Sequence, residues 1–66
     1  MTLTVNGEHR DLAAGLTLAD LVTQLTQSTR GVAVAVNGTV VPRRAWQETQ
    51  LADGAVVEIV TAVQGG

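Results

Sequence analysis

A chain of 66 residues with a formal net charge of −2 and no cysteine is long enough for one small domain, and no disulfide can brace it. It contains one histidine, which is too few for a zinc site, and its four basic residues form no long run of the kind that binds nucleic acid. We therefore expect no bound metal, no bound cofactor and no nucleic-acid partner, and a core built from the aliphatic side chains of a chain that is 45% hydrophobic.

The N-terminal segment predicts a β-hairpin. Residues 2–5 alternate polar and apolar side chains, which is typical of a half-buried strand. Asn6-Gly7 follows, and this pair is a strong hairpin signal because both residues tolerate the positive φ of a tight turn. We expect the return strand over residues 8–13.

An amphipathic helix is expected next. Four apolar residues recur at the spacing that forms one stripe of a helix: Leu18, Leu21, Val22 and Leu25. Thr17 is a good N-cap for this helix, and Asp20 three residues later completes a capping box with a shorter acid than usual. The pattern predicts a helix over residues 18–27, with Gly31 as its stop.

A second hairpin follows the helix. Residues 32–36 are rich in valine, and Asn37-Gly38 again provides a two-residue turn. Residues 39–41 form the return strand, and Pro42 after them suits an edge strand, because proline cannot donate to a sheet ladder.

The last third of the chain predicts a central strand. Residues 43–50 show no clear period, so we expect an irregular connection there, with Trp46 packed as its cover. Asp53-Gly54 predicts a turn, and residues 55–63 form an apolar run that is nearly continuous. Such a run predicts a central strand covered on both faces.

Together these elements predict an α+β fold in which one helix packs on one face of a mixed sheet of four to five strands. We expect a folded domain over residues 1–63 and a flexible tail over residues 64–66. The core between helix and sheet is expected to contain Leu3, Val5, Leu18, Leu21, Val22, Leu25, Val57 and Ile59.

No residues within the chain form a catalytic constellation. His9 and Ser28 lie in no nucleophile motif, so we expect no catalysis by the chain itself. The first residues have neither a basic start nor a long apolar stretch, so we expect a cytoplasmic protein that makes no membrane contact.

The tail, Gln64-Gly65-Gly66, carries the candidate working group. A terminal carboxylate is ionised at neutral pH and is a poor electrophile, so it can donate its acyl group only after activation, for example as a mixed anhydride with AMP. Such activation takes place inside the nucleotide site of another protein, and glycine permits close backbone approach there because it has no Cβ. The alternative is a frayed terminus with no role.

These features resemble the bacterial sulfur carriers of thiamine biosynthesis, the ThiS family, over the full length of the chain. The resemblance is carried by seven segments: Val5-Asn6-Gly7-Glu8, Leu16-Thr17-Leu18-Ala19-Asp20-Leu21, Val34-Ala35-Val36-Asn37-Gly38, Val41-Pro42-Arg43 with Trp46 after it, Leu51-Ala52-Asp53-Gly54, Val57-Glu58-Ile59-Val60, and Gly65-Gly66.

The resemblance implies a ubiquitin-like β-grasp fold and a cycle of sulfur transfer. An ATP-using, E1-like activating enzyme adenylates Gly66, and a sulfur-transfer enzyme supplies the sulfur that converts it to a thiocarboxylate. Thiazole synthase then takes this sulfur into the thiazole ring of thiamine. The chain is a carrier rather than an enzyme in this cycle, and the ATP is bound by its partner.

Three other functions stay open at this point. The small subunit of molybdopterin synthase shares the fold and the tail but is usually a longer chain. A β-grasp binding module with an inert tail and a protein modifier are the other two. The absence of lysine from the sequence argues against the modifier, because the chain offers no ε-amino group for building lysine-linked chains on itself.

A docking surface for the activating enzyme is expected on the open face of the sheet. If Glu58 is exposed, then Val56 and Val60 share its face, and with Ala33 and Ala35 they form a shallow apolar patch. The alternatives are that a loop covers this patch or that it is ordinary apolar surface.

A basic pair, Arg43 and Arg44, is expected to be solvated. Its alternative role is to steer an acidic partner toward the chain.

Overall fold

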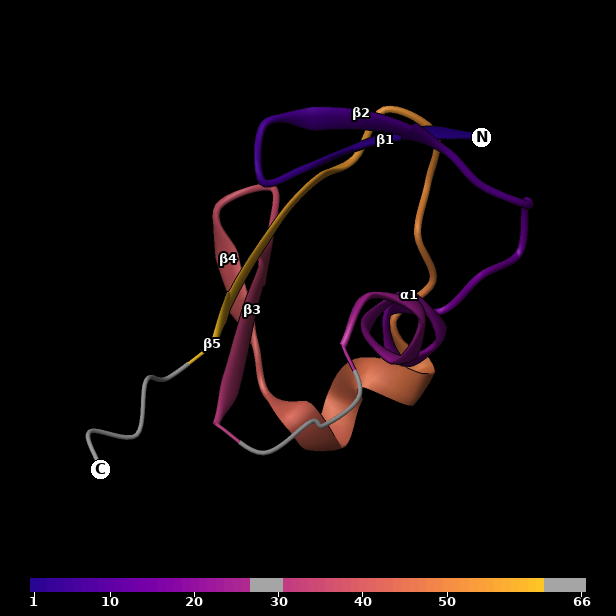
Figure 1. The fold of residues 1–66 in the computed structure, drawn as a ribbon. Coiled ribbons are helices and arrows are strands. Elements are labelled where there is room, and N and C mark those ends of the chain that lie inside the picture. Colours follow the sequence, from indigo (N-terminus) through magenta and orange to yellow (C-terminus); the bar gives the residue numbers. More distant parts are fainter. Residues whose placement is uncertain (27–30, 62–66) are drawn as a thin grey trace.

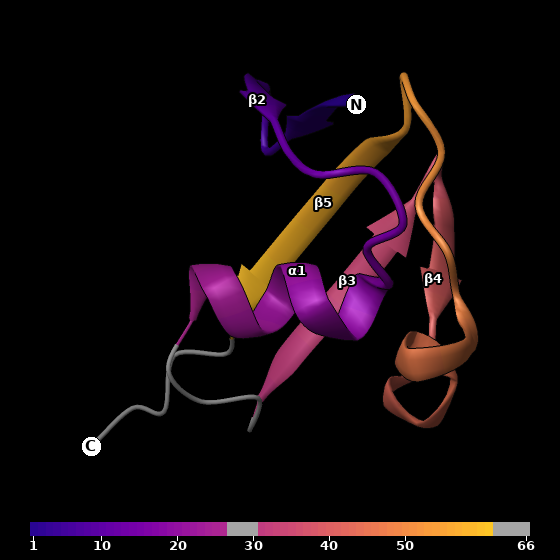
Figure 2. The same cartoon turned by 90° about the vertical axis from the view of Figure 1, so that its right-hand side faces the viewer.

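In the computed structural model, which describes residues 1–26 and 31–61, five strands form one sheet and helix α1 (Leu18–Leu25) lies across one of its faces (Figures 1 and 2). The strand order is β2-β1-β5-β3-β4. The sheet is mixed, because β5 runs parallel to β1 and antiparallel to β3. The predicted α+β class, with one helix on one face of a mixed sheet, is confirmed.

The first hairpin consists of β1 (Thr2–Val5) and β2 (Glu8–Asp11). The predicted turn is confirmed, since Asn6 and Gly7 have φ values of 50° and 83°. Strand β2 ends two residues earlier than predicted. In the register Thr2 lies opposite Asp11, so β1 has only Met1 left to pair beyond that point.

Helix α1 begins with the predicted capping box. The Thr17 hydroxyl accepts a hydrogen bond from the Asp20 backbone N–H at 3.2 Å, and the Asp20 carboxylate accepts one from the Thr17 N–H at 3.1 Å. The helix ends at Leu25, because Thr26 is extended with φ −143° and ψ 145°. The predicted end at residue 27 is therefore too late and Gly31 is not the stop, which agrees with the weak helix propensity of threonine.

The second hairpin is formed by β3 (Val32–Val36) and β4 (Thr39–Val41). Its turn repeats the geometry of the first one, with φ values of 51° at Asn37 and 84° at Gly38. Strand β4 is the edge strand that Pro42 predicted.

The segment after Pro42 is more regular than predicted. It forms a 3-10 helix, η1 (Arg43–Glu48), instead of an irregular connection. Trp46 is only 4% exposed, and its indole N–H donates to the Val41 carbonyl at 2.9 Å, which confirms its role as a cover. A 3-10 helix this short buries one large side chain and leaves no apolar stripe for periodicity to detect.

Strand β5 (Val56–Thr61) lies in the centre of the sheet, as predicted. The prediction that both of its faces are covered is wrong. Val57 faces the core with no exposed surface, whereas Val56 and Val60 are 45% and 63% exposed. The reason is visible in Figure 2, where α1 crosses one face of β5 and β3.

The core lies between α1 and the sheet, and η1 closes one end of it. Of the eight predicted core residues, six are buried, and Leu25 and Ile59 are half-buried at its margin. The buried residues are Leu3, Val5, Leu18, Leu21, Val22, Val34, Trp46, Leu51, Ala55 and Val57.

Candidate functional site

The sheet face opposite α1 carries the predicted docking residues. Val56, Val60 and Ala33 are exposed, and Ala35 is half-buried. Ala33 lies opposite Val60 in the register, and Ala35 lies opposite Glu58. These five side chains share one face because residues alternate between the two faces along each strand. No loop within residues 1–26 or 31–61 covers the patch, because Val56 and Val60 are exposed.

Val40 belongs to the same surface, although the sequence reasoning missed it. It is 71% exposed and lies opposite Ala35 in the β3–β4 register. The two-residue turn at Asn37-Gly38 fixes that register, so the sequence contained the signal that pairs these residues. We name Ala33, Ala35, Val40, Val56 and Val60 the open-face patch.

A shallow hollow of about 190 Å³ lies within the open-face patch. It is lined by Ala33, Val34, Ala35, Val40, Glu58 and Val60. Val56 lies beside the hollow instead of in it. Glu58 is exposed, and in the described part of the chain no ion pair neutralises its carboxylate. The surface is thus apolar with one negative charge near its centre.

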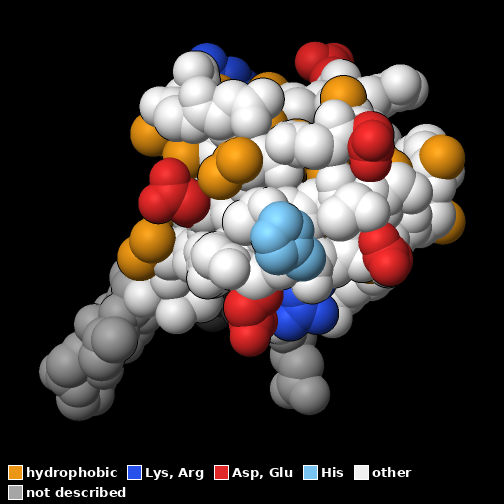
Figure 3. Space-filling model, turned by 90° about the horizontal axis from the view of Figure 1, so that it is seen from above, with side chains coloured by type: hydrophobic (Ala, Val, Ile, Leu, Met, Phe, Trp, Pro, Cys, Tyr) orange, Lys and Arg blue, Asp and Glu red, His pale blue; other side chains and the backbone are white. Residues whose placement is uncertain are grey.

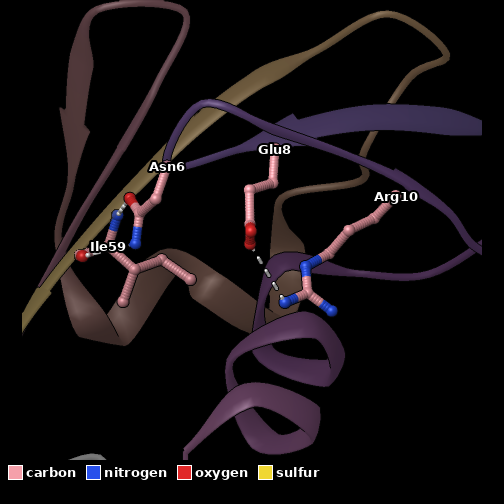
Figure 4. Close-up of polar contacts among 4 residues, drawn as sticks. All are labelled: Asn6, Glu8, Arg10 and Ile59. Atoms are coloured by element: carbon pink, nitrogen blue, oxygen red, sulfur yellow. Dashed lines mark hydrogen bonds and ion pairs between the residues drawn. The ribbon is translucent and has the colours of Figure 1, made fainter.

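The tail residues Gln64, Gly65 and Gly66 lie outside the described residues, so their predicted role is not tested by the structure. What is described is the strand that leads to them. Close to the end of β5, the Asn6 carboxamide bonds to the backbone of Ile59 (Figure 4). On the other edge of β5, Thr61 lies opposite Val32 in β3.

A second hollow lies between α1 and η1. Its volume is about 440 Å³, and it is lined by Ala19, Thr23, Arg43, Arg44, Trp46 and Gln47. Arg43 and Arg44 are both exposed, as predicted, and neither forms an ion pair with any side chain in residues 1–26 or 31–61. Two cations that line one hollow create a local positive field on a chain whose net charge is negative.

The remaining polar candidates that the structure describes form no common site. His9 is exposed on β2, Asp20 belongs to the capping box, and Ser28 lies outside the described residues. Viewed over the first hairpin, the histidine and the acidic side chains are spread across the surface (Figure 3). The ion pair between Arg10 and Glu8 is exposed, with 3.7 Å between its charged atoms. Exposed ion pairs of this kind contribute little to the free energy of folding.

The described residues offer neither a cluster of metal ligands nor a membrane-spanning helix. Within residues 1–26 and 31–61, no three His, Asp or Glu side chains are grouped so that they could hold a metal ion. No helix in those ranges has the length and apolarity needed to cross a membrane.

Comparison with known proteins identifies the family. The sequence model of the ThiS family matches residues 3–66. The chain is 33% identical to the sulfur carrier protein ThiS of Escherichia coli over 66 residues, which are 100% of each chain. It is also 36% identical to a thiazole synthase of Paramagnetospirillum magneticum, but it spans only 20% of the length of that protein.

The fold agrees with this identification. The crystal structure of the thiamine biosynthesis protein ThiS from Geobacter metallireducens is 35% identical in sequence, covers 100% of both chains and superimposes with a TM-score of 0.85. The mixed sheet with β5 at its centre and α1 across one face is therefore the ubiquitin-like β-grasp fold. The chain belongs to the ThiS family of sulfur carrier proteins for thiamine biosynthesis.

Proposed function

We propose that the carboxylate of Gly66 is the group that carries the sulfur. It attacks the α-phosphorus of ATP in the site of an E1-like activating enzyme, and pyrophosphate leaves. A sulfide equivalent from a sulfur-transfer enzyme then displaces AMP from the acyl adenylate and leaves a thiocarboxylate on Gly66. The observation that carries this proposal is the similarity to a sulfur carrier protein that continues through residue 66 of this chain and to the end of that protein.

In this cycle the chain is a co-substrate and its partners are the enzymes. ATP binds to the activating enzyme, and the chain itself holds no cofactor or metal. Because the activation step consumes ATP, we place the cycle in the cytoplasm. Two glycines at residues 65 and 66 suit the task because a segment without Cβ atoms can enter a narrow channel.

The open-face patch is the proposed docking surface for the activating enzyme. Its exposed valines, Val56, Val60 and Val40, lose contact with water when a partner covers them, and this burial favours association. The exposed carboxylate of Glu58 adds a requirement for a basic group on the partner. The patch lies on β5, the strand that continues into the tail, so docking there brings the tail to the enzyme.

Thiazole synthase is the proposed acceptor of the sulfur. The support is the 36% identity between this chain and a segment that makes up 20% of a thiazole synthase. The match to the ThiS family favours this pathway over the molybdopterin alternative.

Intact mass spectrometry tests the proposal. The chain is co-expressed with the candidate activating and sulfur-transfer enzymes, and fragmentation locates any added mass. Replacement of oxygen by sulfur at Gly66 should add about 16 Da, a covalent change of the chain terminus. A variant that lacks Gly66 is the matched control and should stay at its unmodified mass. If the parent chain also stays unmodified, or if the added mass lies elsewhere, the binding module with an inert tail is the better explanation.

A further inference from the structure

The two Asn-Gly turns hold β5 in the same manner. Asn6 donates its backbone N–H to the Val57 carbonyl at 2.9 Å, and its side-chain Oδ1 accepts from the Ile59 N–H at 2.8 Å. Asn37 donates its backbone N–H to the Val56 carbonyl at 2.7 Å, and its Oδ1 accepts from the Val56 N–H at 2.9 Å. One turn acts near the end of β5 and the other at its start.

The Asn6 side chain also makes a bond that has no counterpart at Asn37. Its Nδ2 donates to the Ile59 carbonyl at 3.1 Å, so one carboxamide satisfies both backbone groups of Ile59 (Figure 4). Strand β1 pairs with β5 only as far as Val5, opposite Val57, and then turns away. A carboxamide offers the same donor and acceptor as a peptide group, so Asn6 takes the place of the next residue of β1 in the ladder.

The contact between Asn6 and Ile59 lies close to the point where β5 ends and the chain continues toward the tail. Ile59 lies two residues before the end of β5, and beyond it the described part of β5 is paired with β3 alone, through Val60 and Thr61. The contact with Asn6 is therefore the last one on the β1 side of the strand. We propose that Asn6 is a positioning residue, which fixes the direction in which the chain leaves the sheet toward Gly66. The inference rests on the proposed role of Gly66.

Geometry shows why the direction matters. Gly66 lies seven positions after Ile59, and a segment of this length reaches about 23 Å when it is extended in the channel of a partner. A rotation of about 10° at Ile59 would move the far end of such a segment by about 4 Å. Reacting atoms must come within about 3–3.5 Å of each other in a productive complex, so a displacement of this size removes the carboxylate from the α-phosphorus.

The two turns provide a matched pair of variants. Asn6→Gly and Asn37→Gly each remove a side chain that is exposed, so neither variant leaves a cavity. Each keeps its backbone bond to β5, and glycine adopts the positive φ of 50° or 51° without strain. Asn6→Asp is the partial rescue, because a carboxylate can accept from the Ile59 N–H but cannot donate to its carbonyl.

Nuclear magnetic resonance measures the positioning without any partner. In Asn6→Gly, the Ile59 amide should exchange faster with solvent, and the residual dipolar couplings of the Val60 and Thr61 amides, the last two in β5, should shrink. In Asn37→Gly these couplings should match those of the parent. Equal couplings in Asn6→Gly and Asn37→Gly would overturn the inference.

Pyrophosphate exchange with the activating enzyme measures the consequence for activation. Asn6→Gly should lower kcat/KM about 10-fold to 100-fold, mostly through kcat because the open-face patch is unchanged. Asn37→Gly should stay within about 2-fold, and Asn6→Asp should lie between them. Equal losses in both glycine variants would mean that the turns only stabilise the fold. If the parent itself shows no exchange, the proposed function fails, and the couplings alone decide the role of Asn6.

Discussion

Ala33 in β3 lies directly opposite Val60 in β5, and both side chains are exposed on the sheet face away from α1. Alanine covers little of its neighbour, so Val60 remains 63% exposed although its strand lies in the centre of the sheet. A central strand with exposed valines provides apolar surface that a partner protein can bury.

Replacing Val60 by aspartate should therefore separate binding from folding. The substitution places a charge beside the charge of Glu58 and should weaken binding of the activating enzyme in calorimetry. The melting temperature should hardly move, because Val60 packs against nothing in the core. Ala13→Asp adds the same charge at an exposed position in the loop before α1 and should bind like the parent. Loss of folding in Val60→Asp would show that this face needs its valine for stability.

Leu21 should be a large contributor to stability. Its side chain has no exposed surface, and it lies on the face of α1 that packs on the sheet. Leu21→Ala should lower the free energy of unfolding by about 2–5 kcal/mol in a denaturant titration, because the substitution leaves a cavity. Val40→Ala, at a valine that is 71% exposed, should change it by less than about 0.5 kcal/mol. Similar values for the two variants would mean that the packing of α1 is assigned wrongly.

Arg43 and Arg44 should act on the rate of association. Reversing both charges to glutamate should slow binding of an acidic partner in stopped-flow measurements at low salt, because exposed charges steer diffusional encounter. The difference should vanish as salt rises and screens these charges. Neutral glutamine at both positions should give intermediate rates. Equal rates for all three proteins at low salt would leave the basic pair as ordinary solvated surface.

The length of the tail should control activation without affecting the fold. A variant without Gly66 should melt like the parent but should not support pyrophosphate exchange, since its carboxylate falls about 3.5 Å short. One alanine added after Gly66 should also block exchange, through the extra length and a Cβ in the channel. Exchange at the parental rate in the shortened variant would remove Gly66 from the mechanism.

The parts of this fold that could be predicted are those with local signals. The turns at Asn6-Gly7 and Asn37-Gly38 need positive φ, and asparagine followed by glycine supplies it. The start of α1 was predicted because Thr17 and Asp20 satisfy each other across one helical turn.

The parts that could not be predicted depend on contacts between distant residues. The hydrogen bonds between Asn6 and Ile59 join positions that are 53 residues apart, and no local sequence pattern predicts them. The apolar run of β5 predicts a strand covered on both faces, because hydrophobicity alone cannot distinguish a core valine from an exposed one. Only Glu58 within the run indicated that one face is open. The 3-10 helix could not be predicted because its six residues bury only Trp46 and so show no apolar periodicity.

The central place of β5 also decides when the domain can fold during synthesis. In the described sheet, the β1–β2 hairpin and the β3–β4 hairpin are joined only through β5. The ribosome makes residues 56–61 after all the other strands, so a nascent chain that stops before Val56 has two separate hairpins and a helix with no sheet to cover. We expect such incomplete chains to stay unfolded and open to proteolysis. The domain can therefore fold only after translation has passed β5, the strand next to the tail.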